Sequence, residues 1–358
     1  MAQFTFEMID GPGTVAGKAC LALDKNSNPY IAYAGIGRQL MLANRVAGSW
    51  VREEVFSAGL VSGIDARICL EIDSKGNPHI AYLNDDSLLT YGVKRDQHWE
   101  FTPIPTSLFG DSRGVSGFDF SLHSGRFNHE LRDTPYFAFH DLTTSSLGFT
   151  RKVAERFKRM LVVPEDNLWN IGLCPSMVFD GDSETCLIAY IAVREEGGLV
   201  PATSVRVTRI NDPTEGIVGF TSFSDSGYFV VNRPTSIVGG TEWCVAYADL
   251  TNGKLKASVL DLSIAEPHKE IVTDTVFPVV PSVALEPGSR HGYRIAFGDG
   301  NNLKLASRNR FGVWVVEVVD PNGGDMPSLA YDNLGNAHIA YTVGETLKYA
   351  MGTGVRFI

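Results

Sequence analysis

Hydrophobic and polar positions along the chain follow a pattern that repeats seven times. Each copy is centred on a short apolar run of the type Ile-Ala-Tyr. Such runs are typical of buried β-strands, and no long stretch shows the period of a helix. The central alanines of the runs are Ala32, Ala81, Ala138, Ala189, Ala246, Ala296 and Ala340. They lie 44 to 57 residues apart, which is a repeat length typical of propeller blades.

The segments around each run predict three further strands. A second apolar run precedes it, as in residues 281–285, and a turn rich in Asp, Gly and Asn separates the two. These turn residues supply the hydrogen bonds and positive φ angles that a hairpin needs. A third run follows, as in residues 303–307, and then often a fourth that starts with Trp, as in residues 314–319. The pattern predicts an all-β, seven-bladed β-propeller with four antiparallel strands per blade.

The two ends of the chain predict how the last blade is completed. The seventh copy has no fourth strand, whereas residues 3–9 alternate polar and apolar side chains before the first copy begins. We therefore expect an N-terminal strand, residues 2–9, to complete the blade formed by about residues 327–358. This pairing would cover an exposed sheet edge. We expect residues 1–358 to form a single propeller domain.

Charge and composition limit the classes of partner that we expect the protein to bind. The chain has 31 Lys and Arg against 41 Asp and Glu, a net charge of −10, and no basic run, so we expect no nucleic-acid partner. It has no apolar stretch long enough for a membrane helix and no signal-peptide pattern, so we expect no membrane partner and a cytoplasmic location. The five dispersed cysteines fit a reducing compartment. The oligomeric state stays open.

Aligning the repeats shows two sets of positions at the start of the first strands. One set comprises Cys20, Cys69, Asp119, Ser176, Thr235, Ser282 and Ser328. The set two positions earlier, at one mouth of the propeller, comprises Lys18, Arg67, Gly117, Cys174, Arg233, Val280 and Met326. The three cations Lys18, Arg67 and Arg233 are expected to hold a carboxylate, enolate or acidic phenol, with Asp119 one level below to move protons. The alternative is that each cation faces solvent or pairs with a loop acid.

Aromatic and apolar residues gather in the segments that enter the same strands. They are Phe118, Trp169, Tyr228 and Phe277, with Met326 beside them. Long aromatic loops over a rigid ring are typical of a pocket for a planar or apolar ligand, so we expect these side chains to bind substrate. A plain cover over the end of the core is the alternative.

One histidine is placed for general acid/base catalysis. His140 follows the third Ile-Ala-Tyr-like run, where other blades have Ala34, Leu83 or Gly298, and precedes Asp141. A structural histidine is the alternative. We expect His79 and His338, at the opposite end of their strands, to have a semi-exposed packing role.

Several standard motifs are absent from the sequence. It has no zincin helix, Cys-x-x-Cys pair, phosphate-binding Gly loop, dinucleotide fingerprint or Gly-x-Ser-x-Gly elbow. We therefore expect cofactor-free chemistry, with no assigned metal site, although a weakly held divalent cation stays open. The same absences argue against hydride transfer and covalent serine catalysis.

The repeat resembles those of the sialidase-like seven-bladed propellers, a superfamily of glycosidases, polysaccharide lyases and lectins. The Ser-x-Asp-x-Gly-x-Thr-Trp box of sialidases is absent, so the resemblance implies the architecture and no sialidase site residue. In length and blade architecture the chain is also similar to the propeller hetero-Diels–Alderases of fungal secondary metabolism.

The expected function is that of a small-molecule enzyme, a cofactor-free lyase or cyclase. It would promote an elimination, addition or Diels–Alderase-like cyclisation on an anionic or polarised substrate in the central funnel. Two alternatives stay open, a uronate-cleaving polysaccharide lyase and a non-catalytic carbohydrate-binding lectin.

Overall fold

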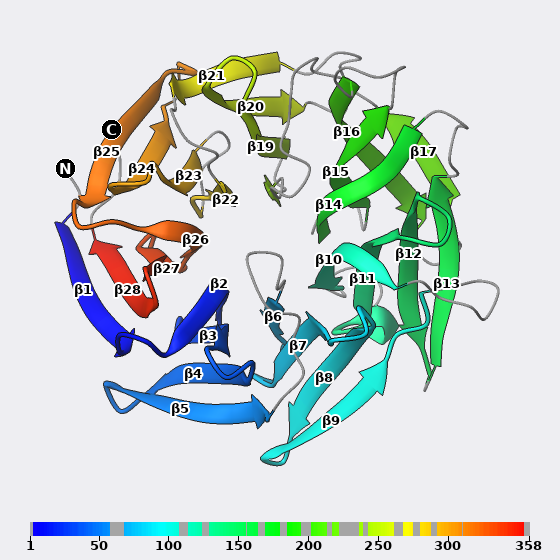
Figure 1. Ribbon diagram of the computed structural model, residues 1–358, viewed down its shortest axis with the longest axis horizontal. Helices are drawn as coiled ribbons and strands as arrows, with labels where there is room; N and C mark the ends of the chain where they lie inside the picture. The colour runs from blue at the N-terminus through cyan, green and yellow to red at the C-terminus, as the bar shows by residue number, and fades with distance from the viewer. Residues whose placement is uncertain are drawn as a thin grey trace. The chain divides into compact units, whose positions relative to one another are not determined.

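The protein is all-β, and its strands form seven four-stranded antiparallel sheets, as the repeats predict (Figure 1). The fold class is therefore the predicted seven-bladed β-propeller. The computed structural model describes residues 3–57, 68–106, 114–123, 129–154, 156–163, 169–179, 185–194, 202–212, 217–221, 236–238, 243–260, 268–274, 280–287, 292–309 and 311–353.

The chain divides into two compact units. Unit 1 comprises Met1–Asp86, Thr90–Thr102 and Val279–Ile358, and unit 2 comprises Ser87–Leu89 and Pro103–Pro278. We number the blades by the order of their first strands. Blades 1, 2, 6 and 7 belong to unit 1, apart from Leu89 and Pro103 at the ends of two strands of blade 2, and blades 3, 4 and 5 belong to unit 2.

In unit 1 the strands of each blade pair in chain order, except that β1 completes blade 7. Blade 1 contains β2 (Val15–Leu23), β3 (Pro29–Gly35), β4 (Leu40–Val46) and β5 (Ser49–Phe56). Blade 2 contains β6 (Ile68–Ile72), β7 (Pro78–Leu83), β8 (Leu89–Arg95) and β9 (His98–Pro103). Blade 6 contains β22 (Ser282–Leu285), β23 (Tyr293–Gly298), β24 (Leu303–Arg308) and β25 (Trp314–Asp320). Blade 7 contains β26 (Asp325–Tyr331), β27 (Ala337–Val343), β28 (Thr346–Thr353) and β1 (Gln3–Asp10).

Unit 2 has the same strand order in each blade. Blade 3 contains β10 (Val115–Leu122), β11 (Pro135–Asp141), β12 (Ser146–Val153) and β13 (Arg156–Val163), with a short 3₁₀ helix, η1 (His129–Leu131), before β11. Blade 4 contains β14 (Trp169–Phe179), β15 (Cys186–Arg194), β16 (Ala202–Asp212) and β17 (Ile217–Thr221). Blade 5 contains β18 (Ser236–Val238), β19 (Trp243–Asp249), β20 (Lys254–Leu260) and β21 (His268–Asp274).

The N-terminal strand completes the last blade. β1 pairs antiparallel with β28, from Gln3 opposite Thr353 to Asp10 opposite Leu347. Figure 1 shows the two strands side by side, β1 in blue and β28 in red. The expectation drawn from the chain ends is confirmed.

The apolar runs form the second strand of each blade and are buried on both faces. In β3, Ile31, Ala32 and Tyr33 have no exposed surface. The tyrosine also has a polar role, because its hydroxyl donates a 2.7 Å hydrogen bond to Asp10 at the end of β1 in the neighbouring blade. Tyr341 of blade 7 makes the same 2.7 Å bond to Asp320 at the end of blade 6. The repeated tyrosine therefore links blades within unit 1.

The small polar residues near the start of the inner strands form a second link between blades. Each accepts a hydrogen bond from a backbone N–H of the next inner strand in its own unit. The donor and acceptor pairs are Leu21 and Ser328, Leu329 and Ser282, Met177 and Asp119, and Ile237 and Ser176. The hydrogen bond explains why the set contains hydroxyls and a carboxylate, which crowding alone would not require.

The register of blade 5 corrects the sequence alignment by one residue. Ser236, and not Thr235, lies opposite the central Ala246. The position two residues before Ser236 in the sequence is Pro234, so the count that placed Arg233 in the ring of cations is shifted by one. Thr235 and Arg233 themselves lie outside the described residues.

We expect Ser282→Ala and Ser328→Ala each to lower the free energy of unfolding by about 1 kcal/mol, because each leaves a backbone N–H of the next blade without its acceptor. Urea unfolding followed by tryptophan fluorescence measures the change. Ser49→Ala, at the exposed start of β5, is the matched control and should change stability little. Equal stability of all three variants would contradict the proposed link.

Candidate functional site

A β-bulge at the start of blade 3 exposes a serine. Val115 of β10 lies opposite Asp141 of β11, and Gly117 lies opposite His140, so Ser116 is the extra residue of the bulge. Its neighbours on both sides are buried, whereas Ser116 is exposed. A bulge interrupts the ladder and redirects a side chain, which is why bulges are frequent beside active sites.

The side chain of Ser116 ends a chain of three hydrogen-bonded groups. Its Oγ lies 2.5 Å from Nδ1 of His140, and Nε2 of His140 lies 2.6 Å from Oδ1 of Asn170. Because an amide oxygen can only accept, Nε2 carries the ring hydrogen. Nδ1 of the neutral ring is then an acceptor, and the Ser116 hydroxyl donates to it. We call these three residues the Ser116 triad.

Blade 4 brings the asparagine to this histidine. Asn170 is the second residue of β14, and the next N–H, that of Ile171, donates a 3.0 Å hydrogen bond to the carbonyl of Ser145 in blade 3. Gly172 allows this close approach. Its φ is +96°, and a Cβ there would lie 2.7 Å from Cα of Leu147. Only glycine satisfies both conditions without displacement.

Burial sets the protonation state of His140. The residue is 1% exposed, and this burial lowers the pKa of its imidazole below the usual 6.5, although the Asn170 hydrogen bond and the charge of Asp141 act in the opposite direction. The ring is therefore neutral near pH 7 and can accept a proton. Asp141 does not bond to it, since its carboxylate accepts from the Thr143 N–H and the Thr144 hydroxyl and so caps the turn.

The triad places a proton acceptor behind an exposed hydroxyl. His140 itself has almost no exposed surface and both ring nitrogens are engaged, so its chemistry reaches solvent through Ser116. His140 can accept the hydroxyl proton of Ser116 and later return it, while the amide of Asn170 holds the imidazole in place.

The other two predicted site residues of blade 3 are part of the framework. Asp119 accepts hydrogen bonds from the N–H groups of Phe120, at 3.0 Å, and Met177, at 2.8 Å. Phe118 is fully buried. These contacts support a structural role for Asp119 and the core-cover alternative for Phe118, and their predicted roles in catalysis and substrate binding stay predictions.

In unit 1 the structure describes two predicted residues. Lys18 lies in the irregular stretch of β2 between Val15 and Ala19, and Met326, with a φ of +47°, lies in that of β26 between Asp325 and Ser328. Both are half-buried. Their shared place at a bulge agrees with the alignment that put them in one set.

The other predicted site residues fall in segments that the structure does not describe. Arg67, Arg233, Tyr228 and Phe277 lie outside the described residues, as does the side chain of Trp169, whose backbone begins β14. Within the part of the chain that the structure describes, no three His, Cys, Asp or Glu residues are grouped to hold a metal ion. No helix among the described residues is long and apolar enough to span a membrane.

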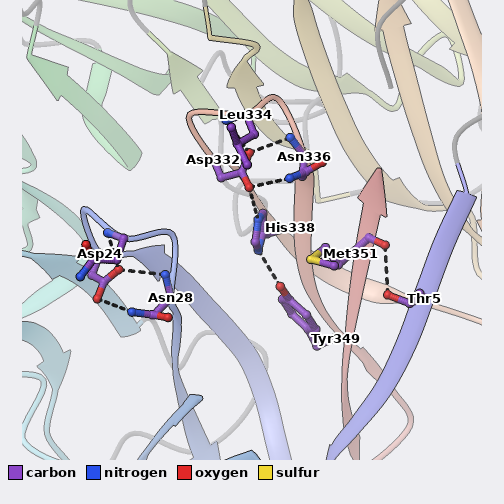
Figure 2. Close-up of polar contacts among 10 residues, drawn as sticks. Thr5, Asp24, Asn28, Asp332, Leu334, Asn336, His338, Tyr349 and Met351 are labelled. Carbon is purple, nitrogen blue, oxygen red and sulfur yellow. Dashed lines mark hydrogen bonds and ion pairs between the residues drawn. The ribbon is translucent and has the colours of Figure 1, made fainter. Parts of the chain in front are cut away.

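His338 and His79 each belong to a hydrogen-bonded triad of a different kind. His338 Nδ1 lies 2.6 Å from the Tyr349 hydroxyl, and its Nε2 lies 3.4 Å from Asp332, whose carboxylate also caps the turn to Asn336 (Figure 2). His338 is 3% exposed, and Tyr349 is 1% exposed.

Blade 2 repeats this arrangement with Asp73, His79 and Tyr91. These histidines are buried, and not semi-exposed as the sequence predicted, because each ties a turn to the third strand of its blade. Neither triad ends at an exposed group, so both are structural.

Ser116 and Asn170 were missed in the sequence. Ser116 lies between Gly114 and Gly117, outside any Gly-x-Ser-x-Gly elbow, and Asn170 is adjacent to the predicted Trp169. The glycines around Ser116 are the signal that indicates an irregular strand start. The structure thus shows a histidine-bound serine where the missing elbow had argued against one.

Comparisons with known proteins bear on the fold. No family model matches the chain, and no curated protein matches it. Virginiamycin B lyase from Staphylococcus aureus is 12% identical, with a TM-score of 0.57 over 97% of this chain and 99% of that one. A streptogramin B lyase is 12% identical, with a TM-score of 0.55 over 98% of each chain. A PL25 ulvan lyase bound to -[GlcA(1-4)Rha3S]- is 13% identical, with a TM-score of 0.61 over 97% and 95%. The chain thus shares its seven-bladed propeller architecture with lyases.

Proposed function

We propose that the chain is a lyase-class enzyme that removes a proton from an anionic or polarised substrate and promotes an elimination, or an addition or cyclisation through the same kind of polarised state. The Ser116 triad carries this proposal, because it holds a neutral proton acceptor next to an exposed hydroxyl. The lyases that share the architecture support the reaction class.

The proposed elimination needs two proton movements. Ser116 Oγ takes the proton from the carbon beside a carboxylate or carbonyl while its own proton passes to Nδ1 of His140. The C–H electrons form a C=C bond as the bond to the leaving group breaks. The proton then returns through Ser116 to the leaving group. Asn170 holds the imidazole in the tautomer that this transfer requires.

The sequence names Lys18, Arg67 and Arg233 for the developing negative charge, and that role stays a prediction. Opposite charge at an enolate lowers the barrier only if it is in place before the proton leaves. The aromatic residues proposed to orient the substrate are Trp169, Tyr228 and Phe277.

A uronate-cleaving polysaccharide lyase is the second candidate. The ulvan lyase with a TM-score of 0.61 is bound to a glucuronate-containing disaccharide. A uronate fits the proposed chemistry, because its carboxylate acidifies the adjacent C–H and its glycosidic oxygen is the leaving group.

The test is turnover of a panel of uronate polysaccharides and β-substituted carboxylates, followed by the absorbance of the new conjugated C=C bond. We expect His140→Gln to lower kcat/KM at least about 100-fold, because the proton loses its acceptor. The wild-type pH profile should lose activity on the acid side with a midpoint below 6.5, since burial lowers the pKa of His140 and protonation removes the base.

His129→Gln, an exposed histidine of the same blade, is the matched control and should keep wild-type turnover. Turnover of His140→Gln equal to that of this control would exclude the proposed base.

A further inference from the structure

Beyond elimination, we propose that Ser116 is a nucleophile that accepts acyl groups from carboxylic esters or thioesters, which gives the protein an acyl-transfer or esterase activity. The proposal uses the same three side chains as the proposed lyase reaction but does not depend on that reaction. Its basis is the hydrogen-bonded order of hydroxyl, imidazole and amide, in which the imidazole is buried and the hydroxyl is exposed.

A nucleophile requires three features that Ser116 combines. Its Oγ is within hydrogen-bond reach of an imidazole nitrogen that carries no hydrogen, which is the diagnostic contact of an activated serine. The imidazole is fixed by a third group, Asn170, at 2.6 Å. The hydroxyl stands on a bulge at the exposed end of β10, where an acyl donor can approach.

The structural triads of unit 1 provide an internal comparison. In both, the hydroxyl on Nδ1 belongs to a buried tyrosine, Tyr91 or Tyr349, and the group on Nε2 is a carboxylate that caps a turn. The Ser116 triad replaces the buried phenol with an exposed alcohol and the capping carboxylate with an amide. Among these three triads, Ser116 alone presents its hydroxyl to solvent.

The covalent step balances without a cofactor. Ser116 Oγ attacks the carbonyl carbon as its proton moves to Nδ1 of His140, and a C–O bond forms. The bond to the alcohol or thiol then breaks, and the leaving group takes the proton from His140. Water attacks the acyl-serine by the same sequence and releases the carboxylic acid and the free serine.

An alkyl fluorophosphonate tests the nucleophile directly, since serine displaces fluoride from phosphorus and retains the label. We expect the full-length protein to gain one probe mass, located at Ser116 by peptide mass spectrometry. Ser116→Ala should abolish the label, and His140→Gln should slow labelling at least about 100-fold. Ser49→Ala, at an exposed serine of blade 1, should label like the wild type.

Asn170 is a positioning residue, and a pH profile separates that role from a structural one. Asn170→Asp puts a carboxylate on Nε2, which should raise the pKa of His140 and move the acid limb of the labelling rate to higher pH. Asp141 is the charged group that already acts on this ring, and it is unchanged in the variant. An unchanged limb would contradict the positioning role.

Two outcomes would overturn the nucleophile. One is a Ser116→Ala protein that labels as fast as the wild type. The other is no label at Ser116 in a folded protein that hydrolyses no p-nitrophenyl acetate. These results are independent of lyase turnover, so a protein that eliminates but does not label would refute only this inference, and one that labels but does not eliminate would refute only the proposed function.

Discussion

A chain that lacks residues 1–10 should be largely insoluble when expressed, and any soluble fraction should not unfold cooperatively. The deletion removes β1 and leaves the N–H and C=O groups of β28 along one edge without partners. Such an edge pairs readily with other chains. The deletion also removes Ile9, a buried member of the core between blades 1 and 7.

Polar contacts increase the expected loss. Asp10 accepts the hydrogen bond of the fully buried Tyr33 hydroxyl and forms an ion pair with Arg52, and Glu7 accepts from Trp50 Nε1 at 2.8 Å. Without Asp10 the phenol has no acceptor in the core, which costs about 1 to 3 kcal/mol in addition to the lost strand.

Soluble yield, size-exclusion chromatography and thermal unfolding by circular dichroism measure the effect. Asp10→Asn in the full chain is the control, since it keeps β1 and should fold with a moderately lower melting temperature. A synthetic peptide of residues 1–12, added during refolding, should partly restore solubility. A deleted chain that melts like the full one would show that β1 does not hold the last blade together.

The blade framework could be predicted because the same strand and turn patterns recur in every blade. The seven alanines identify the second strands, and the turn and strand patterns around them fix the strand order even where one copy is irregular. The one-residue error at Thr235 falls beside β18, which has three residues and little pattern to align.

The site could be predicted only in part, because it depends on departures from the repeat. His140 was found because it replaces small or apolar residues in its column. Ser116 was not found, because a bulge shifts the alternation of buried and exposed side chains by one residue. The strand therefore carries no periodic signal across the bulge. Phe118, predicted to bind substrate, is buried two residues after Ser116, and its role stays a prediction. Asn170 is joined to His140 by packing between two blades, which no local pattern encodes.

Gly172→Ala should lower the free energy of unfolding by roughly 2 to 4 kcal/mol and remove most of the reactivity of the Ser116 triad. A φ of +96° is strained for alanine, and the added Cβ would lie 2.7 Å from Cα of Leu147, so backbone must move. The strand that moves is β14, which carries Asn170 two residues away. The Ile171 hydrogen bond to Ser145 would open with it.

Gly76→Ala is a control that separates the backbone strain of a positive φ from the steric clash expected in Gly172→Ala. Gly76 has a similar φ, +91°, but no atom lies within 4 Å of the Cβ position, so its alanine variant should lose only about 1 kcal/mol. Urea unfolding and the fluorophosphonate labelling rate of the two variants measure stability and triad geometry separately. If Gly172→Ala matched Gly76→Ala in both, β14 would not depend on its close approach to Leu147, and the placement of Asn170 would need another cause.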